Sequence, residues 1–160
     1  MVKLKHIDQN SKFRILHSAF TLVELLIVIS IIGVLVTIGL VSFRNSQARA
    51  RDAQRKSDLK QISSALELYY SDYGKYPNSI TFGSEFTDNK TVYFKILPDD
   101  PNSSLNYVYR IVDSGTNQKY QLFSYLENTQ DPDLVTTTQS CGSGKTCNFA
   151  ITSSNTTVSE

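Results

Sequence analysis

Catalysis needs a nucleophile, a general base or a bound metal, and this sequence offers few residues for any of these roles. Its only two histidines, His6 and His17, both precede a long apolar segment. No glycine-rich phosphate loop, HExxH zinc motif or nucleophile elbow occurs. The sequence therefore predicts a protein that is not an enzyme.

The two cysteines, Cys141 and Cys147, lie close together in the stretch CGSGKTC. A close pair of cysteines that follows an apolar membrane segment indicates a disulfide formed in an oxidising compartment. Two unpaired thiols in a flexible loop are the alternative. A zinc site would need further ligands, and no histidine follows the pair.

Two aspartate pairs are candidates for cation binding, Asp99 with Asp100 and Asp131 with Asp133. Calcium takes six to eight oxygen ligands from carboxylates and carbonyls. Aspartates also serve as ordinary turn residues, and we favour that interpretation. The sequence thus predicts no cofactor, with Asp131 and Asp133 as the weak calcium candidates.

Five cations follow the apolar segment within a short stretch: Arg44, Arg49, Arg51, Arg55 and Lys56. Such a stretch could contact DNA. However, the whole chain has 16 basic and 15 acidic residues and a formal net charge of +1, which argues against a nucleic-acid binder. We expect these charges to meet lipid head groups or acidic groups of neighbouring molecules.

Residues 20–43 form an apolar segment in which Glu24 is the only charged residue. As a helix, these residues would extend about 36 Å, enough to cross a hydrocarbon core of about 30 Å. A cleavable secretory signal would have a shorter apolar core and a small-x-small cleavage site. The segment therefore predicts a membrane helix that stays on the protein.

The acid in this segment needs an explanation, because a charge at the centre of a membrane helix costs about 2.5–3.5 kcal/mol. Glu24 lies near the start of the helix, where the helix dipole and interfacial water would lower that cost. No Lys, Arg or His occurs between His17 and Arg44. A positive partner would have to come from another copy of the chain or from a new amino terminus.

The stretch HSAFTLVELLIVISIIG resembles the class III signal of type IV pilins and of the related pseudopilins of type II secretion systems. The resemblance implies that residues 1–19 are a basic leader, cleaved between Ala19 and Phe20, and that Phe20 becomes N-methylated. It also implies that Glu24 acts in filament assembly by meeting the terminal amine of a neighbouring subunit. The family usually has glycine where this chain has Ala19, and many members have a proline near the position of Val41.

The resemblance further implies a structural subunit of a type IV pilus or related filament, held as a prepilin in the bacterial cytoplasmic membrane. It would cross the membrane once, with its C-terminal domain outside, and later stand in a cell-surface or periplasmic filament. Its partners would be a prepilin peptidase and methyltransferase, copies of itself, related pilins, and an assembly platform with its motor. The alternatives are a minor pseudopilin of a secretion or DNA-uptake machine, and a monomeric membrane-anchored binding domain.

The predicted helix continues through residues 44–74, because no proline occurs before Pro77. An apolar stripe along it should bury against a sheet, with spacings of three and four: Leu59, Ile62, Leu66, Tyr69 and Tyr73. Gly74 is a plausible C-cap. The fold class is therefore α+β, with a long helix whose first half spans the membrane and whose second half packs on a small antiparallel sheet, as in pilins.

Residues 75–160 are predicted to form a β-rich globular head. Between residues 78 and 106 we expect a loop with one short element. The runs NYVYRIV and KYQLFSYL flank DSGTNQ and predict a hairpin, and CNFAIT predicts a third strand. The polar tail TSSNTTVSE predicts a mobile or decorated surface segment.

Overall fold

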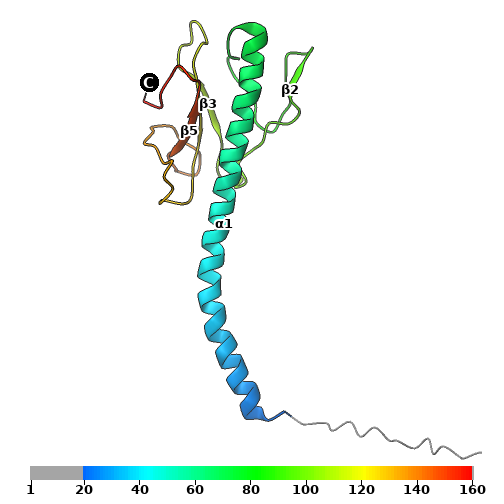
Figure 1. Cartoon of the computed structure of the whole chain (residues 1–160), viewed down its shortest axis with the longest axis vertical. Coiled ribbons are helices and arrows are strands. Elements are labelled where there is room, and N and C mark those ends of the chain that lie inside the picture. The colour runs from blue at the N-terminus through cyan, green and yellow to red at the C-terminus, as the bar shows by residue number, and fades with distance from the viewer. Residues whose placement is uncertain (1–19, 160) are drawn as a thin grey trace, which may run out of the picture. The chain divides into compact units, whose positions relative to one another are not determined.

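The computed structural model describes residues 20–159, which form one helix and five strands. The helix α1 (Leu22–Tyr73) has 52 residues, and the strands follow it in the chain (Figure 1). The described chain divides into a first compact unit that ends at Leu40 and a second unit of Val41–Glu160. The predicted α+β class, a long helix followed by small antiparallel sheets, is confirmed.

The first unit contains the apolar part of α1. Its described side chains are exposed along the whole of 20–37, and Leu40 is exposed as well. An 18-residue window in this helix has a mean hydropathy of 2.9, with none of it buried. The helix is therefore long and apolar enough to cross a membrane.

In the second unit, α1 packs on a three-stranded antiparallel sheet. The sheet consists of β3 (Val108–Ile111), β4 (Tyr120–Ser124) and β5 (Phe149–Thr152), in the order β3-β4-β5. The predicted hairpin and third strand are thus confirmed. The predicted helix stripe is also confirmed in its centre, because Leu59, Ile62 and Leu66 have no exposed surface.

The central strand β4 is buried along its whole length because both of its faces are covered. Tyr120 and Leu122 belong to the core cluster that contains the buried face of α1. Phe123, which points the other way as alternation requires, packs with Cys141 and Cys147 in a second cluster. The head thus has one core on each side of its sheet.

The chain between residues 78 and 106 contains two short strands where we predicted one element. β1 (Phe86–Thr87) and β2 (Val92–Phe94) pair as a small antiparallel hairpin. Strands of two and three residues are too short for an alternating pattern to be visible in sequence. Rings from this hairpin pack near the end of α1, where the centroids of Tyr69 and Tyr93 are 5.2 Å apart.

The helix ends as predicted at Gly74. Its φ of 65° lies in the left-handed region, and its N–H donates to the carbonyl of Tyr70 at 2.7 Å. The polar tail, in contrast, packs against β4 and does not stand free. Gln121 Nε2 donates to the carbonyl of Thr157 at 2.6 Å, and Val158 contacts the cluster around Phe123.

Candidate functional site

Three hydrogen bonds join Thr21 and Glu24 at the start of α1. The backbone N–H and the hydroxyl of Thr21 donate to Glu24 Oε2 at 3.0 and 2.8 Å, and the N–H of Glu24 donates back to Thr21 Oγ1 at 3.2 Å. This is a capping box, in which an N-cap threonine and an acid three residues later satisfy each other's backbone. The spacing T-x-x-E would have revealed it in the sequence.

The carboxylate of Glu24 is nevertheless exposed, and no cation of the described residues lies against it. The side chain of the preceding Phe20 is 77% exposed. Ala19, on the other side of the predicted cleavage point, lies outside the described residues. The structure thus brings Phe20 and Glu24 to the beginning of the helix, within about one turn of each other in sequence.

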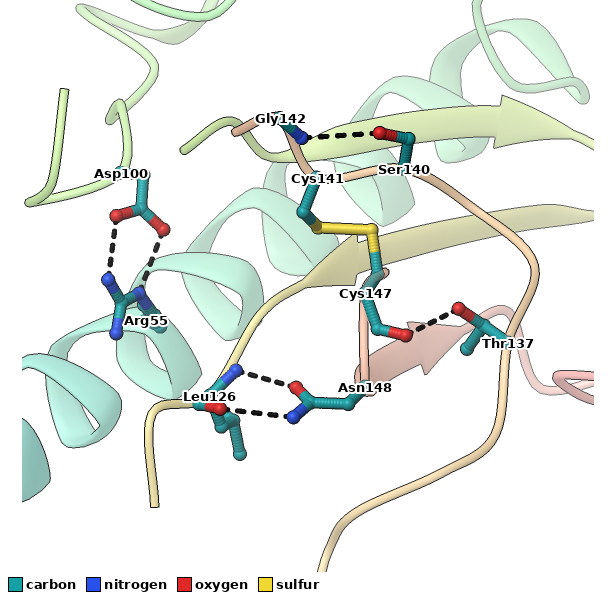
Figure 2. The surroundings of a disulfide bond; sticks show 9 residues. All are labelled: Arg55, Asp100, Leu126, Thr137, Ser140, Cys141, Gly142, Cys147 and Asn148. Carbon is teal, nitrogen blue, oxygen red and sulfur yellow. Dashed lines mark hydrogen bonds and ion pairs between the residues drawn. A yellow bond between two sulfur atoms is a disulfide. The ribbon is translucent and has the colours of Figure 1, made fainter. Parts of the chain in front are cut away.

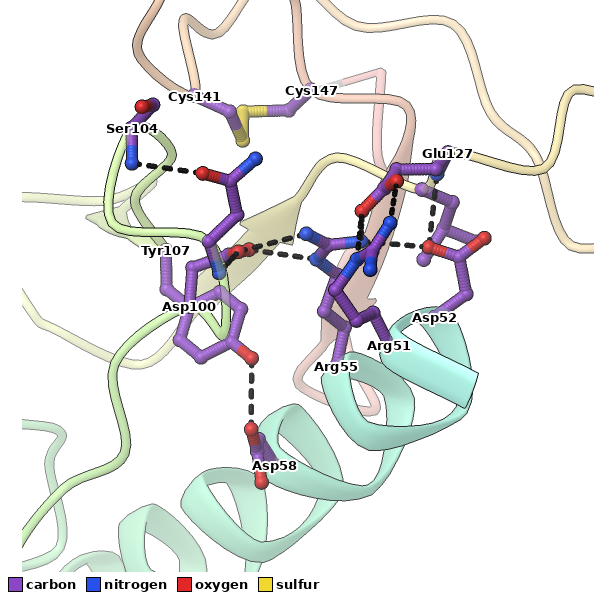
Figure 3. Close-up of polar contacts among 12 residues, drawn as sticks. Arg51, Asp52, Arg55, Asp58, Asp100, Ser104, Tyr107, Glu127, Cys141 and Cys147 are labelled. Atoms are coloured by element: carbon purple, nitrogen blue, oxygen red, sulfur yellow. Dashed lines mark hydrogen bonds and ion pairs between the residues drawn. A yellow bond between two sulfur atoms is a disulfide. The ribbon is translucent and has the colours of Figure 1, made fainter. Parts of the chain in front are cut away.

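A second polar arrangement joins α1 to the head around Arg55, whose side chain has no exposed surface (Figure 3). Arg55 Nε and Nη2 donate to the two oxygens of Asp100, each at 2.8 Å. Its Nη1 donates to Asp52 Oδ1 at 2.8 Å and to Glu127 Oε1 at 2.9 Å. One guanidinium thereby holds three segments of the chain together.

Neighbouring groups complete this cluster. Arg51 donates to both oxygens of Glu127, at 2.7 and 2.5 Å. Asp52 accepts the backbone N–H groups of Glu127 and Asn128 at 2.9 and 2.8 Å. We call Arg51, Asp52, Arg55, Asp100 and Glu127 the arginine cluster. Every charge in it has at least one partner of opposite sign within hydrogen-bond distance.

The charges of the arginine cluster shift one another's pKa values. The hydrogen bonds from Arg51, opposed by burial and helped by Arg55, lower the pKa of Glu127 to about 2. Burial acts to lower the pKa of Arg55, but the hydrogen bonds to Asp100 and Glu127 outweigh it, so its pKa is raised. Beside the cluster, burial raises the pKa of Asp58, although the hydroxyl of Tyr107 donates to it at 2.8 Å.

The calcium candidates Asp131 and Asp133 both contact one lysine. Lys56 Nζ donates to Asp131 Oδ1 at 2.6 Å and to Asp133 Oδ2 at 2.7 Å, and it lies 5.5 Å from the centroid of the Phe149 ring. The hydrogen bond from Lys56 lowers the pKa of Asp131. An ammonium group therefore lies where a cation would bind, and no cluster of three potential metal ligands occurs among residues 20–159.

The role expected for the basic stretch needs correction. Arg51, Arg55 and Lys56 bind acids of their own chain and not the lipid head groups or neighbouring molecules that the sequence predicts. Of the five cations, Arg44 and Arg49 remain exposed. The sequence does not reveal the pairs with the head, because the acidic partners there lie 45 to 77 residues further along the chain.

Cys141 and Cys147 form a buried disulfide, with Cα atoms 5.1 Å apart (Figure 2). It packs on Phe123, on the face of the sheet opposite α1. Gly142, with a φ of 87°, fits there because a Cβ would lie 2.9 Å from Asn106 Nδ2 and 3.0 Å from the carbonyl of Ser104. The adjoining Asn148 donates to and accepts from the backbone of Leu126. The disulfide loop is thereby fastened to the end of β4.

Two family models match the chain. One, described as type II secretion system (T2SS), protein G, matches residues 42–133, and the other, the prokaryotic N-terminal methylation motif, matches residues 16–40. The chain belongs to the type II secretion system protein G family. The match to protein G covers α1 from Ser42 and the arginine cluster, whereas the disulfide and β5 lie beyond it.

Protein G relatives include the type II secretion system core protein G of Escherichia coli, 30% identical over 116 residues, or 66% of this chain and 78% of that one. The core protein G of Pectobacterium carotovorum is 28% identical over 66% of this chain and 72% of its own length. A type IV major pilin protein, PilA of Myxococcus xanthus, is 36% identical over 47% of this chain and 36% of its own. No solved structure matches the chain.

Proposed function

We propose that this protein G-family chain is a pilin-like filament subunit that is held in the bacterial cytoplasmic membrane as a single-pass prepilin with its head outside. A prepilin peptidase would cut between Ala19 and Phe20, the new Phe20 amine would be methylated, and an assembly platform and motor would add the subunit to a filament of copies. The methylation-motif match and the apolar half of α1 support this proposal.

The observation that carries the proposal is the carboxylate of Glu24. It lies in an exposed, otherwise uncharged helical segment, and its hydrogen bonds come from Thr21 alone among the described residues. Both bonds from Thr21 end on Oε2, so the second carboxylate oxygen, Oε1, can accept from a cation. The amine of Phe20 in a neighbouring copy would supply that cation, and in a low-dielectric filament core the pair would exceed a surface salt bridge in strength.

Cleavage is tested by mass spectrometry of the mature amino terminus. A product that begins with N-methylated Phe20 is the expected result. A chain that keeps its leader would instead indicate a monomeric membrane-anchored domain, for which Glu24 has no assembly role.

Assembly is tested by replacing Glu24 with Gln and comparing the membrane level of the subunit with the amount of sheared filament. We expect normal membrane levels and a nearly complete loss of filaments. Glu85→Gln is the matched control, because it removes an exposed carboxylate from the head. Normal filaments in the Glu24→Gln variant would refute the pairing. Immunogold labelling at filament ends alone would identify a minor pseudopilin.

A further inference from the structure

A pocket of about 280 Å³ lies between α1 and the loop that follows β4. Asn45, Ala48 and Arg49 line it from the helix, and residues 127–130 line it from the loop. All of these residues belong to the second unit of the chain. Apart from Ala48 the lining side chains are polar, so the pocket suits a polar ligand.

The pocket presents hydrogen-bond donors that find no acceptor within residues 20–159. Arg49 forms no ion pair with a described residue, in contrast to the two arginines of the arginine cluster. The side chains of Asn45, Thr129 and Gln130 likewise form no hydrogen bond with the described residues. The pocket therefore offers a guanidinium and several neutral donors to an acceptor from outside the chain.

Glu127 is the one acidic residue among the described residues that line the pocket. Its two oxygens accept from Arg51 at 2.7 and 2.5 Å, and Oε1 also accepts from Arg55 at 2.9 Å (Figure 3). Two guanidinium groups of the same chain thus already neutralise this carboxylate. The charge of Arg49 is left uncompensated in the pocket, where it attracts an anion.

The pocket lies at the depth of lipid head groups if the apolar segment spans a membrane. That segment ends at Phe43, and Asn45 and Arg49 follow it by two and six residues, or about 3 and 9 Å along a helix. The head-group layer is about 5–8 Å thick on each side of the hydrocarbon core. Helix side chains tilt toward the N-terminus of their helix, which directs the guanidinium of Arg49 back toward this layer.

We propose that this pocket binds the head group of an anionic phospholipid while the subunit is held in the membrane. The lipid phosphate would accept from the guanidinium of Arg49, and Asn45 and Thr129 would donate to further oxygens of the head group. The inference rests on the membrane-held prepilin of the proposed function and adds a lipid ligand to its head. It assigns to a built pocket the lipid contact that the sequence suggested for the whole basic stretch.

The first test measures lipid binding by the unassembled full chain in uncharged maltoside micelles. Phosphatidylglycerol is titrated into the micelles, and the backbone amide signals of Thr129 and Gln130 are followed by NMR of the isotope-labelled chain. We expect saturable shifts, with binding at least about fivefold weaker for the zwitterionic lipid phosphatidylcholine. Equal binding of the two lipids, or no shift with either, would overturn the inference.

Inorganic phosphate, added to the same micelles, distinguishes a lipid from a soluble anion. We expect no saturation of the Thr129 and Gln130 shifts at the phosphate concentration that equals the saturating concentration of phosphatidylglycerol. Saturation there would assign the pocket to free phosphate and overturn the lipid. If phosphatidylglycerol fails to bind while Arg49→Gln abolishes filaments, the pocket binds an acidic group of another subunit, which also contradicts the inference.

The second test removes the charge from the pocket. Arg49→Gln should weaken the binding of phosphatidylglycerol at least about tenfold, because it removes a charge-assisted donor. Arg44→Gln is the matched control, since Arg44 is an exposed cation of the same helix that does not line the pocket. Its effect should be clearly smaller. Equal losses in the two variants would indicate general attraction to a basic surface and contradict a specific site.

The third test adds an opposing charge without changing the shape of a side chain. Asn45→Asp should also weaken binding at least about tenfold, because the new carboxylate repels the phosphate within the pocket. Ser46→Asp, which adds the same charge at the next residue and outside the lining, should bind nearly as the unmodified chain does. Undiminished binding by Asn45→Asp would contradict the proposed site.

All of these binding measurements use unassembled subunits, so they are independent of filament formation. Failure of the chain to bind phosphatidylglycerol would overturn the lipid site and leave the filament function intact. Failure of the unmodified chain to be cleaved or to form filaments would instead overturn the proposed function.

Discussion

The two halves of α1 have the same backbone but opposite surroundings. Beyond Val41 the helix buries one face on its own head, with Leu59, Ile62 and Leu66 fully covered and Arg55 bound to three acids. Before Leu40 the described side chains are all exposed. The head can therefore be stable by itself, whereas the apolar half depends on lipid or on other subunits.

Among the changes considered, Arg55→Met is expected to lower the free energy of unfolding of the head and its half of α1 the most. The change leaves the buried carboxylates of Asp52 and Asp100 without their cation, which typically costs about 3–5 kcal/mol. Urea unfolding of the detergent-solubilised chain, followed by the circular dichroism of its tyrosines, measures the loss. Membrane insertion of the apolar half should not change.

Arg51→Met is the control for this measurement, because Arg51 is 36% exposed and its partner Glu127 keeps Arg55. We expect a loss of about 1 kcal/mol or less. Equal losses in the two variants would show that burial of Arg55 is not what fastens α1 to the head.

Removal of the disulfide is expected to cause the second-largest loss of stability. Replacing Cys141 and Cys147 together with Ala frees a short loop, and the chain-entropy relation gives a loss of about 2 kcal/mol. Thermal unfolding with and without a reductant checks this value. The reductant should lower the melting temperature of the unmodified chain and leave that of the variant unchanged.

Acid should loosen the second half of α1 through Glu127. Its folded pKa is about 2 and its ordinary value is 4.5, so its contribution to stability is complete above pH 4.5 and is lost as the pH falls toward 2. The lowered pKa of Asp131 acts in the same direction, and the raised pKa of Asp58 partly opposes both.

A series of melting temperatures between about pH 6 and about pH 2 tests this dependence on acid. Glu127→Gln, which cannot titrate, should show a flatter profile than the unmodified chain. An identical profile would mean that other carboxylates set the acid response.

Thr21→Ala should act on the first half of α1 alone. Loss of the cap at Thr21 costs about 1 kcal/mol of local helix stability. Amide hydrogen exchange at residues 24–26 in detergent micelles measures it. Ser30→Ala is the control, because Ser30 Oγ donates back to the carbonyl of Leu26 and caps nothing. Unchanged exchange at these amides in Thr21→Ala would exclude a capping role.

The smallest effect is expected from Lys56→Gln. Lys56 is 28% exposed and Asp133 is 60% exposed, so solvent screens their attraction, and the loss should be below about 1 kcal/mol. Urea unfolding of the Lys56→Gln and Arg55→Met variants under the same conditions compares their losses directly. A loss as large as that of Arg55→Met would remove the distinction between buried and exposed pairs.

The elements of this fold were predictable where the pattern is local. The helix, its stop at Gly74 and the three-stranded sheet follow from spacing, capping and turn residues near one another in the sequence. The apolar segment and Glu24 were likewise visible without a structure.

The arginine cluster was not predictable in this way. Arg55 lies in a run of cations that looks solvated, and its partners Asp100 and Glu127 lie 45 and 72 residues away. Only the packing of the head on α1 brings them together. The contact of the tail after β5 was hidden for the same reason, since its polar composition does not reveal that Gln121 binds the carbonyl of Thr157.

The arginine cluster also has a mechanical consequence. If the proposed filament is pulled, tension along α1 would act to separate the head from the helix. Arg55 reaches Asp100 through two bonds, while Asp52 holds the backbone of Glu127 and Asn128 through two more. Bonds loaded in parallel share a force and break together, whereas bonds loaded in series fail one by one. These four hydrogen bonds all join α1 to the head. The head can therefore leave the helix only when all four are broken.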